Sequence, residues 1–231
     1  MYDYIDFFLR KIPSSLKGDS VTAGPNHLLD VGDDAPMLQL ADAKIYYHHL
    51  MQLIWLAKRS RPDLLLALSY LNTRVQSRNI HNWKKLARTC KYLHSTCHIP
   101  LILKGGSLNS IKWYIDVVFS VHHNMRSHTG IMMMMGKGCI YGASGRQNIN
   151  TKSSTEAELM GISDALPQVI WSWNFLRAQG YQVNESIIYQ DNQSTIRICN
   201  NGRASSSKRA RHIDIRYFFI TDCINSKEVR V

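Results

Sequence analysis

The hydrophobic pattern of this chain changes its period at Pro100, and this change constrains the fold more than any other feature. Between 42 and 97, apolar residues recur three and four positions apart, which predicts amphipathic helices. After Pro100 the apolar runs are short and are separated by glycine and polar turns, which predicts strands. A longer helical pattern covers 155–179 and ends at Gly180. The order expected after Pro100 is βββ-α-β-α-α-β, a mixed α/β layer.

We therefore expect two parts, a small helical unit over 1–104 and an α/β domain over 105–231. Residues 1–41 contain three prolines and several glycines and aspartates, and are expected to be irregular. The first three strands are expected within "LILK", "IKWYIDVVFSV" and "GIMMMMGKGCIYGAS", with the four methionines in a buried strand. Pro167 lies inside the long helical pattern, where it should cause a kink or divide the pattern into two helices.

The charge of the chain points to a polyanionic partner. The 231 residues carry a formal net charge of +11 and have a sequence pI of about 9.5. Nucleic acid and an anionic membrane surface both fit such an excess. No apolar run approaches the roughly 20 residues that a membrane span needs. The N-terminal stretch "MYDYIDFFLRKIP" lacks the features of a signal peptide, so we expect an intracellular protein.

Two glutamates near the start of the long helix are expected to differ in environment. The apolar residues of this helix form one stripe at spacings of 3 and 4, comprising Leu159, Ile162, Leu166, Val169 and Trp173. At about 100° per residue, Glu158 lies roughly 60° from the centre of the stripe and Glu156 roughly 100° away on the other side. Glu158 should therefore border the buried face. Glu156 is spaced to form a capping box with Ser153.

Two aspartates belong to strands predicted for the same domain. Asp116 follows "IKWYI" inside a strand, although aspartate is depleted in strand interiors, and Asp191 ends the strand "SIIYQ". If these carboxylates converge with Glu158, their repulsion requires a cation, and oxygen ligands of this kind suit Mg²⁺ or Mn²⁺. Two such ions can support phosphodiester hydrolysis. On spacing alone, three unrelated acids remain the alternative.

Four sequence motifs are specific when taken together: "SSTEAEL", "YQDNQSTI", "RHIDIRYFFI" and "IDVVFSVHHNMRSHTG". Together they resemble the ribonuclease H domain of copia-type LTR retrotransposon Pol polyproteins. The upstream words "LIWLAKRSRPDLLLALSYLNTRV" and "WKKLARTCKYLHST" are similar to the end of the reverse transcriptase region of that family. The resemblance implies a ribonuclease H-like mixed sheet with flanking helices over 105–231. It also implies a preceding thumb- or connection-like helical remnant over 1–104.

The resemblance assigns roles to the three acids. Asp116, Glu158 and Asp191 match the metal-binding and catalytic carboxylates of a family that cuts the RNA strand of RNA–DNA hybrids with two Mg²⁺ or Mn²⁺ ions. The family uses a fourth carboxylate after its last strand, and the domain is expected to be truncated before that last helix. Asp214 is a candidate replacement, although a capping or orienting role suits it better. A catalytically inactive, degenerate fragment that at most binds nucleic acid is the alternative function.

Several polar residues are expected to contact nucleic acid. Four cations lie in the segment 202–212, namely Arg203, Lys208, Arg209 and Arg211, a composition typical of phosphate contacts. Arg126 and His128 lie in the first hairpin beside the predicted site. Asn192 and Gln193 could reach the 2′-hydroxyls that distinguish RNA from DNA.

The resemblance also sets the expected context of the chain. The expected partners are an RNA–DNA hybrid and the upstream polymerase palm and fingers of the same polyprotein, with no membrane partner. Asp33 and Asp34 in "DVGDDAP" are an Asp-Asp pair of the kind that polymerases use, but the residues around them indicate a loop. Polymerase activity is therefore not expected. The implied location is a cytoplasmic virus-like particle or the nucleus, and the sequence leaves the oligomeric state open.

Overall fold

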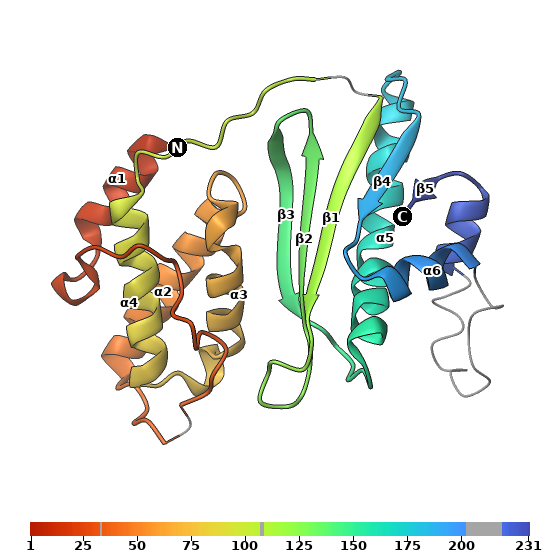
Figure 1. The fold of residues 1–231 in the computed structure, drawn as a ribbon. Helices are drawn as coiled ribbons and strands as arrows, with labels where there is room; N and C mark the ends of the chain where they lie inside the picture. Colours follow the sequence, from red (N-terminus) through yellow and green to blue (C-terminus); the bar gives the residue numbers. More distant parts are fainter. Residues whose placement is uncertain (33, 107–108, 202–218) are drawn as a thin grey trace. The chain divides into compact units, whose positions relative to one another are not determined.

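The chain divides near Leu101 into two units. The computed structural model describes residues 1–32, 34–106, 109–201 and 219–231 (Figure 1). The units are Met1–Leu101 and Ile102–Val231, and each encloses its own hydrophobic core. The division falls three residues before the boundary expected from the sequence, because 102–104 pack against the second unit. The Lys137 amide donates a hydrogen bond to the Lys104 carbonyl at 3.1 Å.

The first unit is helical. Its helices are α1 (Tyr2–Lys11), α2 (Leu40–Ala57), α3 (Leu65–Thr73) and α4 (Ile80–Ser95), with single 3-10 turns at Ser14–Leu16, Pro62–Leu64 and Val75–Ser77. The helical pattern in 42–97 is confirmed, and Pro62 begins a helical turn as its fixed backbone angle favours. The expectation that 1–41 is irregular is wrong for α1. Ile5, Phe8 and Ile12 are spaced 3 and 4 apart and are all buried, so they anchor this helix to the core.

The second unit is built on a five-stranded mixed sheet (Figure 1). The strands are β1 (Ser110–Val118), β2 (His128–Met135), β3 (Gly138–Arg146), β4 (Glu185–Tyr189) and β5 (Val229–Arg230). Their order across the sheet is β3-β2-β1-β4-β5. The first three strands form an antiparallel meander, whereas β4 is parallel to β1 and β5 is parallel to β4. The expected mixed α/β layer is therefore confirmed.

Helix α5 (Ser154–Ala178) packs its apolar stripe against this sheet, mainly on β1. Leu159, Ile162, Leu166 and Val169 are fully buried, as the spacing predicts. The helix continues through Pro167, so the expected division into two helices is wrong, and the alternative of a kink stays a prediction. Pro167 is exposed and the Ser163 residue is half-buried, so water can hydrate the Ser163 carbonyl that loses its amide partner.

The remaining elements complete the layer. Helix α6 (Gln193–Asn201) follows β4, and residues 219–225 are helical within the segment expected to form another helix. Among the described residues, no helix is both long and apolar enough to cross a membrane.

Two expectations about strands need correction. Residues 101–104 do not form a strand, because the structure gives them no ladder partner. The methionine-rich run instead forms part of a hairpin, β2 and β3, which turns at Gly136 with φ of +70°. Of the four methionines, only Met133 is buried and Met132 is exposed, because successive side chains of a strand point to opposite faces.

Candidate active site

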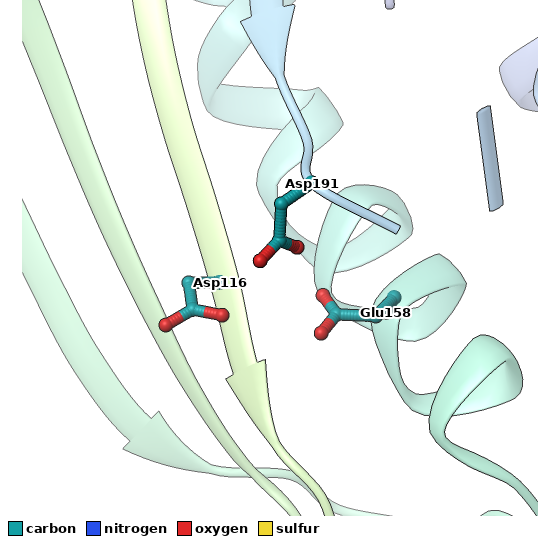
Figure 2. A group of neighbouring side chains, drawn as sticks. All are labelled: Asp116, Glu158 and Asp191. Carbon is teal, nitrogen blue, oxygen red and sulfur yellow. The ribbon is translucent and has the colours of Figure 1, made fainter. Parts of the chain in front are cut away.

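Three carboxylates from separate segments converge at one edge of the sheet in the second unit. Asp116 lies on β1, Glu158 on α5 and Asp191 two residues after the end of β4 (Figure 2). One carboxylate oxygen from each residue lies within 4.8 Å of the corresponding oxygens of the other two. Sequence reasoning named these three residues, and the structure brings all three together.

The local fold explains why they meet. In β1, Ile115 and Val117 are buried against α5, so the alternation of the strand turns Asp116 to the opposite, exposed face. The parallel pairing of β1 with β4 sets Tyr114 beside Tyr189. Asp116 and Asp191 each lie two residues further along, so they come side by side where β4 ends.

Glu158 differs from the two aspartates in its surroundings. Its side chain is buried, with 6% exposure, whereas Asp116 and Asp191 are exposed. Burial raises the pKa of Glu158 to about 7, and repulsion from Asp116 and Asp191 acts in the same direction. Among the described residues, no lysine, arginine or histidine forms an ion pair with any of the three carboxylates. The cluster therefore concentrates negative charge that no described side chain neutralises.

Gln190 orients Glu158 and was missed by the sequence analysis. Its Nε2 donates a hydrogen bond to Glu158 Oε2 at 3.0 Å, and its Oε1 accepts one from the Asn192 amide at 3.0 Å. These two bonds fix the orientation of the side-chain amide. The only signal in the sequence is that Gln190 directly precedes Asp191.

The first turn of α5 carries the predicted cap. Ser153 Oγ accepts a hydrogen bond from the Glu156 amide at 3.2 Å, as a capping box requires. The Glu156 carboxylate reaches the Lys152 amide at 2.7 Å, one residue before the amide that a standard capping box uses. Glu156 is thus occupied at the helix start, and the two glutamates have the separate environments that the helical geometry predicts.

A pocket of about 300 Å³ opens beside the two aspartates. It is lined by Tyr114, Ile115, Asp116, Tyr189, Gln190 and Asp191. The rings of Tyr114 and Tyr189 stack with centroids 4.8 Å apart and form an apolar wall next to the carboxylates. Sequence reasoning missed this tyrosine pair, since it depends on the pairing of two strands that are distant in the chain.

The residues predicted to contact nucleic acid are placed unevenly. Gln193 is exposed at the start of α6, and Arg126 is half-buried in the β1–β2 connection. Asn192 Oδ1 accepts hydrogen bonds from the Ser194 and Thr195 amides at 3.0 and 3.1 Å, so this oxygen caps α6. Arg203, Lys208, Arg209, Arg211 and the alternative acid Asp214 lie outside the described residues.

His128 is buried, so its position does not support the predicted contact with nucleic acid. Only 2% of the residue is exposed, and its ring nitrogens lie 2.9 Å from His122 Nε2 and 2.8 Å from Ser144 Oγ. Burial lowers the pKa of both histidines to about 4. The pair is therefore neutral at physiological pH and holds the β1–β2 connection to β3.

Three features define a ribonuclease H-like α/β domain, the fold class that the sequence predicts. They are the order of the strands, the packing of α5 on the sheet, and the three acids on β1, on α5 and after β4. Solved structures that match the chain include RNase H1 from Halobacterium salinarum, at 14% identity and a TM-score of 0.32. That match covers 49% of this chain and 77% of the other. LC11-RNase H1 from compost matches at 16% identity and a TM-score of 0.36, covering 53% and 83%.

Comparison of the sequence with curated proteins finds relatives among the Pol polyproteins of transposons. It is 28% identical over 173 residues to the retrovirus-related Pol polyprotein from transposon TNT 1-94 of Nicotiana tabacum. It is 29% identical over 174 residues to the corresponding polyprotein from transposon RE2 of Arabidopsis thaliana. Each alignment covers 74% of this chain, but only 13% and 12% of the relatives. The resemblance to copia-type Pol polyproteins is thus confirmed, and the chain spans about an eighth of the length of these relatives.

The chain also aligns with a relative that is not described as a Pol polyprotein. The secreted RxLR effector protein 161 of Plasmopara viticola is 28% identical over 120 residues, covering 52% of this chain and 84% of that protein. No protein-family model matches the chain.

Proposed function

We propose that the second unit is a ribonuclease H-type endonuclease region that hydrolyses the RNA strand of RNA–DNA hybrids with divalent cations. The observation that carries this proposal is the convergence of Asp116, Glu158 and Asp191 within 4.8 Å. The similarity to Pol polyproteins of transposons supports a role in reverse transcription. The same similarity supports an intracellular setting, in a virus-like particle or the nucleus, beside an upstream polymerase.

The three carboxylates fit a divalent cation. Their ligand set is all oxygen, which suits Mg²⁺ and Mn²⁺. Ligand oxygens on opposite sides of a Mg²⁺ ion lie about 4.2 Å apart, close to the 4.8 Å spread of the cluster. No described cationic side chain neutralises the buried Glu158 carboxylate, so a bound metal ion would stabilise its charged form.

The three carboxylates would hold the cations from different sides. Asp116 and Asp191 would hold the cations on the exposed side and Glu158 on the buried side, where Gln190 fixes one of its oxygens. Bound cations supply activation of water and charge stabilisation at the leaving oxygen. The stacked Tyr114 and Tyr189 line one side of the pocket.

The test is cleavage of an RNA–DNA hybrid in Mg²⁺ or Mn²⁺ by the full chain and by Asp191→Asn. Loss of one ligand should lower the rate at least about a hundredfold. Asp222→Asn, the same chemical change at an exposed site outside the cluster, should retain the wild-type rate. Hybrid binding without cleavage by the wild type would favour the inactive-fragment alternative. Equal cleavage by Asp191→Asn would refute the site.

A further inference from the structure

A second charged site lies in the helical unit, far along the chain from the carboxylates. A pocket of about 640 Å³ opens there, and its basic and imidazole lining residues are His27, His81, Lys84, Lys85, Arg88 and Lys91. Asp19 is the one acidic residue in the lining. Four formal positive charges therefore face one negative charge, with the histidines counted as neutral.

Helix α4 arranges most of these groups on one face. His81, Lys84, Arg88 and Lys91 follow one another at spacings of 3, 4 and 3 residues, so they share one side of the helix. Lys84 is exposed, and Arg88 and Lys91 are half-buried. At 1.5 Å per residue, Lys84 and Lys91 are separated by about 10 Å along the helix axis.

Lys85 supports the wall of the pocket and is not available to a ligand. Its ammonium is buried and donates to the carbonyls of Leu28 and Asp30 at 2.6 and 2.5 Å, and lies 3.4 Å from the Tyr70 hydroxyl. These contacts tie the loop before α2 to α4. Burial lowers the pKa of Lys85 to about 8.

The remaining cations have little local compensation. The Asp19 carboxylate is already engaged by His94 at 2.9 Å and by Ser95 at 3.1 Å. Arg88 donates to Thr22 Oγ1 through Nε and Nη2, which leaves other guanidinium donors for a ligand. Burial lowers the pKa of His81, and Lys85, His27 and Lys84 lower it further, while Asp30 opposes them. The pocket therefore has a positive potential.

We propose that this pocket on α4 binds consecutive phosphates of a polynucleotide strand. Lys84, Arg88 and Lys91 are spread over about 10 Å of one face of α4, so they can pair with successive phosphates of one strand. The contacts would be sequence-independent, because cations on one helix face reach the backbone and not the base edges. This site is separate from the carboxylate cluster and does not depend on hydrolysis.

The first test is lysine footprinting of the wild-type chain with an amine-reactive reagent in EDTA, with and without a 20-base-pair DNA duplex. The duplex contains no RNA and the buffer no divalent cation, so the result is independent of cleavage. Lys84 and Lys91 should become at least about fivefold less reactive, whereas Lys44 and Lys58, exposed on and just after α2, should not change. Unchanged reactivity of Lys84 and Lys91 would overturn the proposal.

Two further arms of the footprint identify the source of the phosphate. Inorganic phosphate at the same total phosphate concentration should protect Lys84 and Lys91 much less than the duplex does. Vesicles of phosphatidylcholine and phosphatidylserine should also protect them less. Equal protection by either probe would overturn the assignment to a polynucleotide.

The second test reverses the charges. The variant Lys84→Glu, Arg88→Glu, Lys91→Glu should bind the duplex about tenfold more weakly or worse at 0.1 M salt, with a shallower dependence of log Kd on log salt. The control Lys11→Glu, Lys44→Glu, Lys58→Glu makes the same net charge change at exposed residues outside the pocket. Equal weakening in both variants would overturn the proposal. Circular dichroism checks folding, and the wild-type footprint stands if the first variant does not fold.

Discussion

At Glu158 in the second unit, burial of the side chain conflicts with the negative charge of its carboxylate. The helix stripe fixes its place at the rim of the sheet, and Asp116 and Asp191 add like charge nearby. Its folded-state pKa is raised from 4.5 to about 7. The charged form of Glu158 therefore destabilises the folded chain unless a cation is present. The stabilising contribution of its proton is complete below about pH 4.5 and is lost as the pH rises through 7.

We expect Glu158→Gln to be more stable than the wild type at pH 8 in EDTA, by about 1–3 kcal/mol, and equally stable near pH 4. The glutamine is neutral at both pH values and keeps an oxygen that can accept from Gln190. Urea unfolding followed by circular dichroism measures the difference.

The control for this prediction is Glu156→Gln, which should gain no stability at pH 8 because Glu156 accepts a hydrogen bond in the cap. Adding Mg²⁺ should raise the Tm of the wild type more than that of Glu158→Gln, since a cation bound at the three carboxylates would stabilise the folded state. A pH-independent difference between wild type and Glu158→Gln would contradict the linkage.

At this scale, part of the candidate site could be predicted from the sequence. The different surroundings of Glu156 and Glu158 follow from helical geometry alone, because both lie in one regular element. The burial of His128 could not be predicted, because it depends on His122 and Ser144 from neighbouring segments. Gln190 was missed for the same reason, since its partner Glu158 is 32 residues away.

At the scale of elements, the contact between α5 and the sheet positions Glu158. Gly161 lies one turn after Glu158, and a Cβ at this position would meet Val117 Cγ2 at 2.7 Å and Thr129 Cγ2 at 3.3 Å. A side chain there would push α5 away from β1 and β2, although alanine favours a helix by up to about 1 kcal/mol over glycine.

We therefore expect Gly161→Ala to destabilise the second unit by about 1–3 kcal/mol, because the overpacking exceeds the gain in helix propensity. Adding Val117→Ala removes the group in closest contact and should recover part of the loss, which a double-mutant cycle by chemical unfolding would measure. A stabilised Gly161→Ala protein would show that α5 has room to approach the sheet differently.

Elements with a regular apolar period were predicted well, and those decided by pairing were not. The α5 stripe and the strand at 185–189 have clear patterns and clear ends. The hairpin of β2 and β3 was read as one strand-like run, because Gly136 is a single turn residue between two apolar stretches. Residues 101–104 are apolar enough for a strand, but strand formation requires a ladder partner that the sequence pattern does not reveal.

At the scale of the whole chain, the order of the strands across the sheet could not be predicted from the hydrophobic pattern. Period and turn signals predict that strands exist, but the position of β1 between β2 and β4 depends on contacts distant in sequence. The two cores are separate, one within each unit, so each unit has the packing that independent folding requires.

The boundary between the units can be tested by truncation. The expected division after 104 and the observed division after Leu101 differ by Ile102, Leu103 and Lys104. The Lys104 carbonyl accepts a hydrogen bond from the Lys137 amide at 3.1 Å in the β2–β3 turn.

A protein consisting of 102–231 should therefore fold and be more stable than 105–231 by about 1 kcal/mol, the usual value of one hydrogen bond. Both would be compared by thermal unfolding, with 99–231 as the control. Because 99–101 belong to the first unit, 99–231 and 102–231 should have the same Tm, and equal stability of 102–231 and 105–231 would place the boundary after 104.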